Sequence, residues 1–363
     1  EEANASGRGQ RGTASSVAFY REVLRLSPDH ASAHHYLIHS YETTGQIQKA
    51  LEHGEAYARL APSIPHASHM WGHDLRRVGR VDDAIVQFRK ADALERAYYA
   101  AEKIDPSMDW HHGHNLDLLG MCYQHKGQMA LAESTLRQAS GLVPMDTYGA
   151  FRRRELPHFL IERGRYEEGL KAAEELVRSE YVEARTVAHA LAGRALLGLS
   201  RVEDAQRSLE AARKDLEQCP RVAPGVLPTQ AAVRPWVEGL EGELLLRTGE
   251  REKGRAILDG VVVSLRAAVS PDAWILGLFR LESIARTARE AGDWQLAERL
   301  ARHMLEHDAA YGGSHLAMGL VYQHRGETEK AEKAFEEARR HWKDADSDLP
   351  ELAIIEKRTA SNR

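Results

Sequence analysis

The chain has 363 residues and a formal net charge of −5, with 49 lysines and arginines against 54 aspartates and glutamates. This balance excludes the general basic surface of a nucleic-acid-binding protein. Two distant cysteines, Cys122 and Cys219, argue against a disulfide framework or a thiolate zinc site. No apolar run approaches the roughly 20 residues that a membrane helix needs. We expect no nucleic-acid or membrane partner, and a cytoplasmic protein unless a signal was removed before residue 1.

Residues 1–16 are small and polar and should form a flexible leader. From residue 17 onward a pattern of about 34 residues repeats. Each copy has an apolar helix, a turn residue, Ala at position 20, an apolar residue at position 24 and often Ala at position 27. The predicted turn residues are Gly45, Gly79, Gly127, Gly164, Ser200, Gly249, Gly292 and Gly326. Gly ends a helix well because it accepts the left-handed conformation at low cost. The second helix after Gly79 is longer than usual and runs on to Ile104.

This pattern resembles the tetratricopeptide repeat family over nearly the whole chain. The resemblance implies an all-α, right-handed solenoid of about eight helical hairpins, with first helices lining a concave groove and second helices outside. Residues 17–219 would form an N-terminal array that carries a His-rich groove. Residues 220–235, which contain several prolines, would be an insertion that acts as a loop or a hinge. Residues 236–363 would form a C-terminal array, closed by a capping helix over residues 349–358.

Histidine is the unusual residue of this composition, with 19 copies. Repeat positions 2, 5 and 9 share one face of the first helix, the face toward the groove. In the first four repeats, seven of these twelve positions are histidines, where chance would place fewer than one. They are His35, His39, His66, His69, His73, His114 and His158. The later repeats show no such enrichment.

These histidines predict a metal site. Neighbouring helices lie roughly 8–10 Å apart, so imidazoles at matching positions point into one volume. A cation would relieve the repulsion of protonated rings and would partner neutral ones. The i, i+4 pairs His35/His39 and His69/His73 can each share one ion. These four and His114 are the preferred ligands, and His66 and His158 come next. We expect one or more transition-metal ions, with copper or iron preferred and zinc as the next choice. Packed, hydrogen-bonded histidines without metal remain the alternative.

A second resemblance rests on the same residues. The chain carries an HxxxHxxE block from His35 to Glu42, an HxxHMxxH block from His66 to His73, and an HN pair at His114. These blocks resemble a largely uncharacterised family of bacterial tetratricopeptide proteins over about residues 30 to 130. The chain departs from that family at Asp117, where a histidine is frequent. The resemblance implies a shared site but no particular chemistry.

Three residues are candidates for catalysis. Asp117 and Glu42 are either direct carboxylate ligands or acceptors for a ring N–H, and either could move protons. Arg154, at a groove position, could orient a carboxylate or phosphate. Arg152 is expected on a solvated face, and His111 is expected at the rim of the groove together with His112.

Two functions remain open. The first is a metal-dependent enzyme that acts on a small molecule or peptide in the groove, with oxidative copper or iron chemistry favoured over zinc hydrolysis. The second is a non-catalytic scaffold that binds a peptide or protein partner, with metal structural or absent. Imidazoles stand where a peptide clamp would favour Lys, Asn and Arg, and this favours the enzyme. The sequence contains no phosphate-binding loop, dinucleotide fingerprint or nucleophile elbow.

Overall fold

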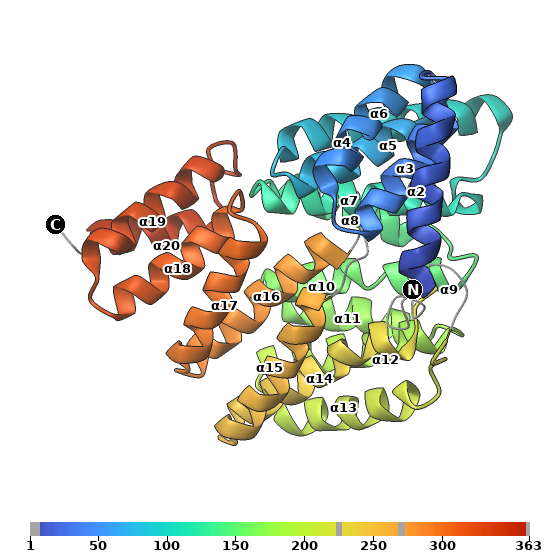
Figure 1. Cartoon of the computed structure of the whole chain (residues 1–363). Helices are drawn as coiled ribbons and strands as arrows, with labels where there is room; N and C mark the ends of the chain where they lie inside the picture. The colour runs from blue at the N-terminus through green and yellow to red at the C-terminus, as the bar shows by residue number, and fades with distance from the viewer. Residues whose placement is uncertain (1–7, 223–226, 268–272, 361–363) are drawn as a thin grey trace.

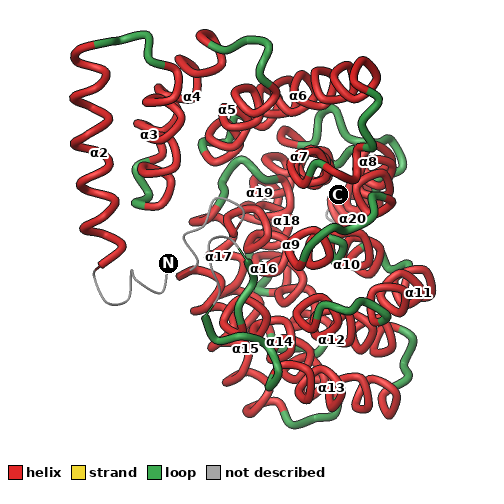
Figure 2. Tube along the Cα trace, turned by 90° about the vertical axis from the view of Figure 1, so that its right-hand side faces the viewer, coloured by secondary structure: helices red, strands yellow, loops and turns green. Residues whose placement is uncertain are grey.

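The computed structural model describes residues 8–222, 227–267 and 273–360, and within these ranges every regular element is a helix (Figures 1 and 2). Eight helical hairpins follow one another in the described chain. They pair α3 (Ala31–Thr43) with α4 (Ile47–Leu60), α5 (Pro65–Arg77) with α6 (Val81–Glu102), α7 (Trp110–His125) with α8 (Met129–Gly141), α9 (Thr147–Arg152) and α10 (Glu155–Glu162) with α11 (Tyr166–Val177), α12 (Val182–Gly198) with α13 (Val202–Leu216), α14 (Gln230–Arg247) with α15 (Arg251–Ala267), α16 (Ala273–Glu290) with α17 (Trp294–His307), and α18 (Gly312–His324) with α19 (Thr328–His341). Helix α2 (Arg8–Leu26) precedes the array, η1 (Pro106–Met108) precedes α7, and α20 (Pro350–Ala360) ends the described chain. None of the described helices has the length and apolar composition needed to cross a membrane.

The eight predicted turns all occur where expected. Every turn residue has a positive φ, from +60° at Ser200 to +93° at Gly249. This left-handed conformation ends the first helix and sends the chain back along it. The predicted α-solenoid of about eight tetratricopeptide-like hairpins is confirmed.

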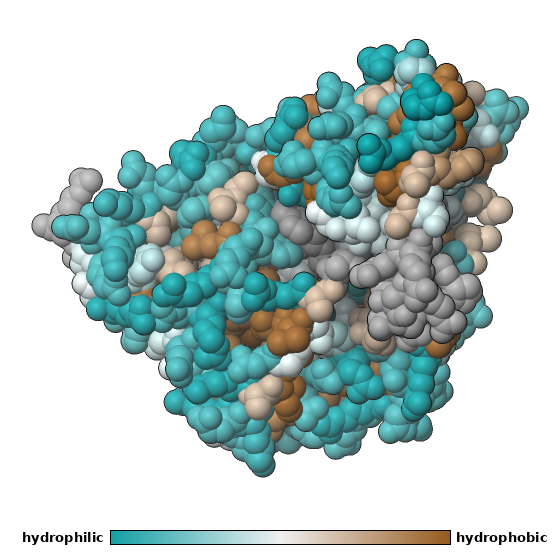
Figure 3. Space-filling model, viewed as in Figure 1, coloured by the Kyte–Doolittle hydropathy of each residue, from teal (hydrophilic) through white to brown (hydrophobic). Residues whose placement is uncertain are grey.

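Inner and outer helices differ in burial as the prediction requires. In α7, every residue from His111 to His125 is buried, because this helix is covered by the hairpins on both sides and by its own second helix. Its partner α8 buries only Ala132, Thr135, Leu136 and Ala139, which share one helical face. The face shown in Figure 3 is mostly hydrophilic, with hydrophobic patches between hydrophilic side chains.

The array also closes on itself, which the repeat pattern does not predict. The end of α19 and the segment before α20 contact the turn between α7 and α8. The Trp342 indole donates a hydrogen bond to the His125 carbonyl at 3.1 Å, and the Asp346 amide donates to the Gly127 carbonyl at 3.1 Å. One hydrophobic cluster contains residues from α5 to α8 and α10 as well as from α14 to α20. The contact therefore joins the third hairpin to the last one.

The predicted segment boundaries differ from the structure in detail. The expected leader, residues 1–16, is helical from Arg8 onward, and residues 1–7 lie outside the described residues. The expected insertion, residues 220–235, ends earlier, because α14 begins at Gln230 and includes Pro235. Pro235 lies inside the helix, in its second turn, where it removes one intrahelical hydrogen bond. Residues 223–226 of this segment are also outside the described ranges. Helix α20 forms over the predicted capping segment.

Candidate metal centre

Six of the seven predicted histidine ligands gather into two groups of three. The first group, here called the open triad, consists of His35 and His39 from α3 and His66 from α5. The second, the buried triad, consists of His69 and His73 from α5 and His114 from α7. Within each triad the candidate ligand atoms lie within 4.8 Å of one another. The His39 side chain is 47% exposed, whereas all three rings of the buried triad are buried.

The ring nitrogens of the open triad converge. His35 Nε2 lies 2.9 Å from His66 Nε2 and 3.1 Å from His39 Nε2. A neutral ring nitrogen carries either one hydrogen or one lone pair. His35 Nε2 therefore cannot satisfy both neighbours with full hydrogen bonds. A metal ion would accept all three lone pairs, and nitrogens bound tetrahedrally at about 2.0–2.1 Å lie roughly 3.3 Å apart. The two spacings from His35 Nε2 lie within a few tenths of an ångström of this value, and the spacing between the ligand atoms of His39 and His66 is at most 4.8 Å.

A chain of hydrogen bonds fixes which nitrogen His66 offers to this triad. Glu95 of α6 accepts from His111 Nδ1 at 2.5 Å, so Nε2 of a neutral His111 ring holds a lone pair. That lone pair accepts from His66 Nδ1 at 2.9 Å. The Nε2 atom of His66 is then unprotonated and faces His35. The other Glu95 oxygen accepts from His112 Nδ1 at 2.9 Å.

The buried triad has a similar support. The Asn115 amide nitrogen donates to the Phe88 carbonyl at 3.0 Å, which fixes the orientation of the amide. Its oxygen then accepts from His69 Nδ1 at 2.9 Å. The Nε2 atom of His69 is left as a potential ligand. Its ring centroid lies 4.6 Å from that of His73 and 4.9 Å from that of His114.

Glu42 stands between the two triads. Its side chain is fully buried, and its two oxygens lie 3.6 Å from His39 Nδ1 and 3.5 Å from His73 Nδ1. The carboxylate thus lies beside Nδ1 of both rings. The other ring nitrogen, Nε2, is the one expected to bind metal. At these distances Glu42 makes no full hydrogen bond to either ring, and its two predicted roles, direct ligand or acceptor of a ring N–H, stay predictions.

Burial favours the neutral form of four of the triad imidazoles. It is the main cause that lowers the pKa of His35 to about 4 and that of His66 to about 2, and the positive charge of neighbouring histidines adds to it. The pKa values of His69 and His114 lie well below 6.5 for the same reasons. Neutral rings hold the lone pairs that a metal needs.

His158, the seventh predicted ligand, does not belong to either triad. It lies in α10, where its ring packs edge-on against Trp236 with 5.3 Å between centroids. Burial and the charge of Arg194 lower its pKa well below 6.5. Arg154 lies in the same region, with its guanidinium carbon 3.9 Å from the Phe151 ring centroid. These two residues belong to the next part of the groove.

Asp117 follows His114 by three residues on α7, and it already has a cationic partner. Arg152 donates to its carboxylate at 2.5 Å. The solvated position expected for Arg152 is therefore wrong, because the side chain is buried against α7. Gly113 allows this approach, since a Cβ there would lie 2.4 Å from the Arg152 guanidinium. The proton-transfer role of Asp117 stays a prediction.

Sequence reasoning missed Glu95 and underrated His111. His111 stands three residues before His114 and so shares its helical face, a signal that could have been used. Glu95 comes from the outer helix α6, whose predicted extension beyond Ala91 carries it over the start of α7. Glu95 also belongs, with Asp92 and His112, to a further group of potential ligand atoms.

Comparisons with known proteins identify repeat structures only. No family model and no curated protein matches the chain. Among solved structures, it is similar to YrrB, described as a TPR protein with an unusual peptide-binding site, at 17% identity and a TM-score of 0.38 over 54% of this chain and 91% of that one. It is also similar to yeast Tom70, at 11% identity and a TM-score of 0.42 over 100% and 95% of the two chains. For MamA the values are 15% and 0.39, over 52% and 92%. The description of the fold as tetratricopeptide-like hairpins therefore stands on the turns and packing of this chain.

Proposed function

We propose that this chain is a metal-dependent enzyme whose groove binds two transition-metal ions, one in each histidine triad. The proposal rests on the open triad, where Nε2 of His39 and Nε2 of His66 both lie close to Nε2 of His35. Hydrogen bonds alone cannot satisfy all three atoms. Imidazole ligands without a thiolate suit copper and iron, with zinc as the next choice.

The two triads would have different roles. Catalytic metal sites keep an open coordination position, whereas structural sites are closed. Both triads offer three histidines, but only the open triad, with half-exposed His39, would leave its open position within reach of solvent or substrate, and the buried triad would hold its ion away from both. A bound ion in the open triad would activate water or dioxygen toward a small molecule or peptide in the groove. Glu95, through His111, would hold the His66 ring in place, and Glu42 would accept the N–H groups of His39 and His73.

Metal analysis of protein purified without a His-tag or chelator tests this directly. We expect up to two ions of copper, iron or zinc per chain. The double substitution His39→Ala and His73→Ala should remove them without loss of helicity, since each triad loses one of three ligands. The matched control is His303→Ala with His324→Ala, two histidines on α17 and α18 far from the triads. Full metal content in the His39/His73 variant would refute the ligand assignment, and no metal in the wild type would refute the site.

A scaffold for a peptide or protein partner is the second candidate, supported by the hairpin array and its groove. Turnover and partner binding separate the two functions. An enzyme should convert a metabolite or peptide under air and stop when the protein is treated with a chelator. Partner capture that is unchanged by chelator, with no turnover across the panel, would favour the scaffold.

A further inference from the structure

The groove continues from the triads to a buried arginine, Arg280 of α16, which is only 8% exposed. It donates to the Pro235 carbonyl at 2.5 Å, and its guanidinium carbon lies 4.2 Å from the Trp236 ring centroid. In the part of the chain that the structure describes, no carboxylate lies within ion-pair distance of Arg280.

Its neighbours are paired. Three other arginines face this part of the groove, and each has a carboxylate partner: Arg154 with Glu155 at 2.8 Å, Arg194 with Glu243 at 3.0 Å, and Arg286 with Glu162. Four guanidinium groups therefore face three carboxylates, and Arg280 carries the excess charge.

A buried charge without a partner is costly. Burial, followed by the repulsion from Arg194, lowers the pKa of Arg280 to about 9. Arg154 also has capacity to spare, because its buried Nε has no hydrogen-bond partner among the described residues. Arg280 therefore lacks an anionic partner among the described residues, and Arg154, although paired with Glu155, keeps one N–H group unused.

A side chain is also absent beside Arg280. Gly239 of α14 occupies the groove position of its repeat one turn after Trp236. A Cβ at Gly239 would meet only the Arg280 guanidinium within 4 Å, at 3.5 Å. The face of α14 beside Arg280 is thus open where a side chain would normally stand.

We propose that this part of the groove is an anion-binding site, in which Arg280 and Arg154 bind the oxygens of a carboxylate or phosphate against the face of Trp236. Planar guanidinium groups match both oxyanions through paired hydrogen bonds. The inference deepens the proposed function, since it assigns an anionic group to the substrate. The site itself needs no metal, so the two proposals can fail separately.

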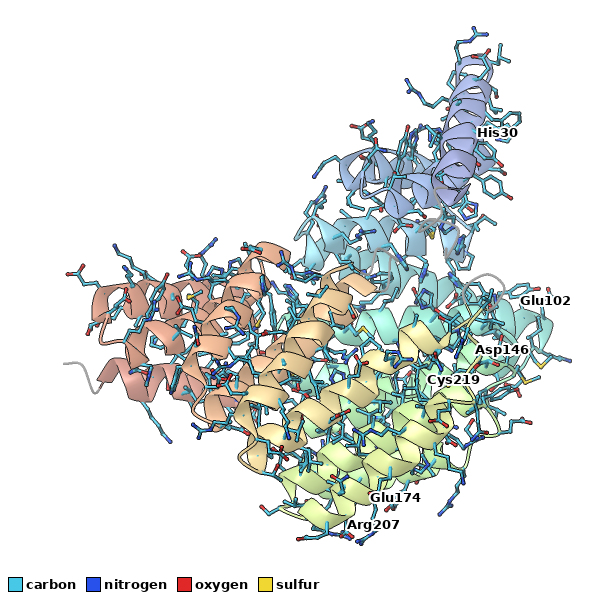
Figure 4. The ribbon with its side chains drawn as sticks, turned by 60° about the horizontal axis from the view of Figure 1, so that its bottom comes forward. His30, Glu102, Asp146, Glu174, Arg207 and Cys219 are labelled. Carbon is cyan, nitrogen blue, oxygen red and sulfur yellow. The ribbon has the colours of Figure 1, made fainter. Side chains whose placement is uncertain are left out.

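Isothermal titration calorimetry on chelator-stripped protein, with inorganic phosphate and with succinate as probes, tests the site. We expect one of the two probes to bind at a single site, and the preferred probe distinguishes a phosphate from a carboxylate ligand. Arg280→Gln should weaken this binding at least tenfold. Arg207→Gln, on the outer helix α13 (Figure 4), is the matched control and should bind as the wild type does. Absence of binding of both probes to the wild type, or equal binding to Arg280→Gln, would overturn the proposal.

A second variant covers the case in which Arg280→Gln does not fold. Gly239→Leu keeps every charge but fills the open space beside Arg280, and leucine favours the helix more than glycine does. It should abolish probe binding while its circular dichroism and metal content match the wild type. A Gly239→Leu protein that binds the probe with unchanged affinity would show that the anion does not occupy this space.

Discussion

The side chains behind the triads decide which nitrogen each ligand histidine presents. Glu95 accepts from His111 and His112 with its two oxygens, so an amide cannot replace it without turning an NH₂ group toward one of the rings. We predict that Glu95→Gln lowers metal affinity roughly 10- to 100-fold, the usual cost of losing an outer partner of a metal ligand. Competition with a chromophoric chelator measures this.

The matched control for this substitution is Glu102→Gln, at the exposed end of the same helix (Figure 4). It changes the same functional group without a histidine contact, and its metal affinity should equal that of the wild type. Equal losses in the two variants would mean that Glu95 acts through the general charge of α6 and not through His111.

A second residue-scale prediction concerns Glu282 of α16. Burial raises its pKa to about 7, against a hydrogen bond from Tyr311 at 2.7 Å that lowers it. The folded state therefore holds this proton more tightly than the unfolded chain does. The resulting stabilisation is complete below about pH 4.5 and is lost as the pH rises through 7, by up to about 1.4 kcal/mol per pH unit.

Thermal unfolding of wild type and Glu282→Gln between pH 4.5 and 8 checks this. The amide mimics the protonated acid, so the stability of the variant relative to the wild type should increase as the pH rises. The buried histidines change stability in the opposite direction over the same range, but they are common to both proteins. A constant difference between the two curves would contradict the raised pKa.

The sequence predicts the members of the triads because they share one face of each first helix, a property of local geometry alone. His35, His39, His69 and His73 could be chosen by counting from the turns. Glu95 could not, because its contact with His111 depends on how far α6 reaches and on the rotation of that helix about its own axis. The burial of Arg152 depends in the same way on the packing of two hairpins.

At the scale of the elements, the turn glycines experience different surroundings. Gly45 and Gly127 have nearly the same φ, +72° and +75°. A Cβ at Gly45 would meet nothing within 4 Å, whereas one at Gly127 would lie 2.7 Å from the Ala345 side chain. We predict that Gly45→Ala costs about 1 kcal/mol for the left-handed conformation, and that Gly127→Ala costs about 2–3 kcal/mol because the C-terminal contact must also shift.

Urea denaturation of the two variants measures the difference. Equal losses would show that Ala345 does not pack on this turn in solution. The sequence could predict a positive φ at every turn. It could not predict which residue packs against a given turn. Helix boundaries also follow from local sequence and could be predicted. The long helix expected to reach Ile104 ends at Glu102.

The closure of the whole molecule lay beyond sequence reasoning. The third and the last hairpins are separated by roughly 200 residues, and they meet because small rotations between successive hairpins add up along the array. The repeat pattern predicts each hairpin, but it does not predict the total rotation between the third hairpin and the last one. Closure also has a consequence for the site, since it covers the turn end of α7 and leaves the open triad accessible.

Leu349 allows the closure to be tested. Its side chain is buried, and its Cδ2 would lie 3.0 Å from a Cβ at Gly127. We predict that Leu349→Asp destabilises the protein by about 3 kcal/mol or more, because it places an unpaired charge in an apolar contact. The C-terminal hairpins should then separate from the third hairpin and increase the radius of gyration measured by small-angle X-ray scattering.

Metal content should survive this change. His114 lies near the start of α7, roughly 20 Å along the helix from the turn at Gly127, given a rise of about 1.5 Å per residue. The control is Ile354→Asp, which introduces the same charge at an exposed position of α20, the helix that follows Leu349. It should change neither stability nor shape. If Leu349→Asp left the scattering curve unchanged, the solenoid would not depend on this contact. If it released the metal, the triads would depend on the closed form, and the groove would work only as part of a closed ring of hairpins.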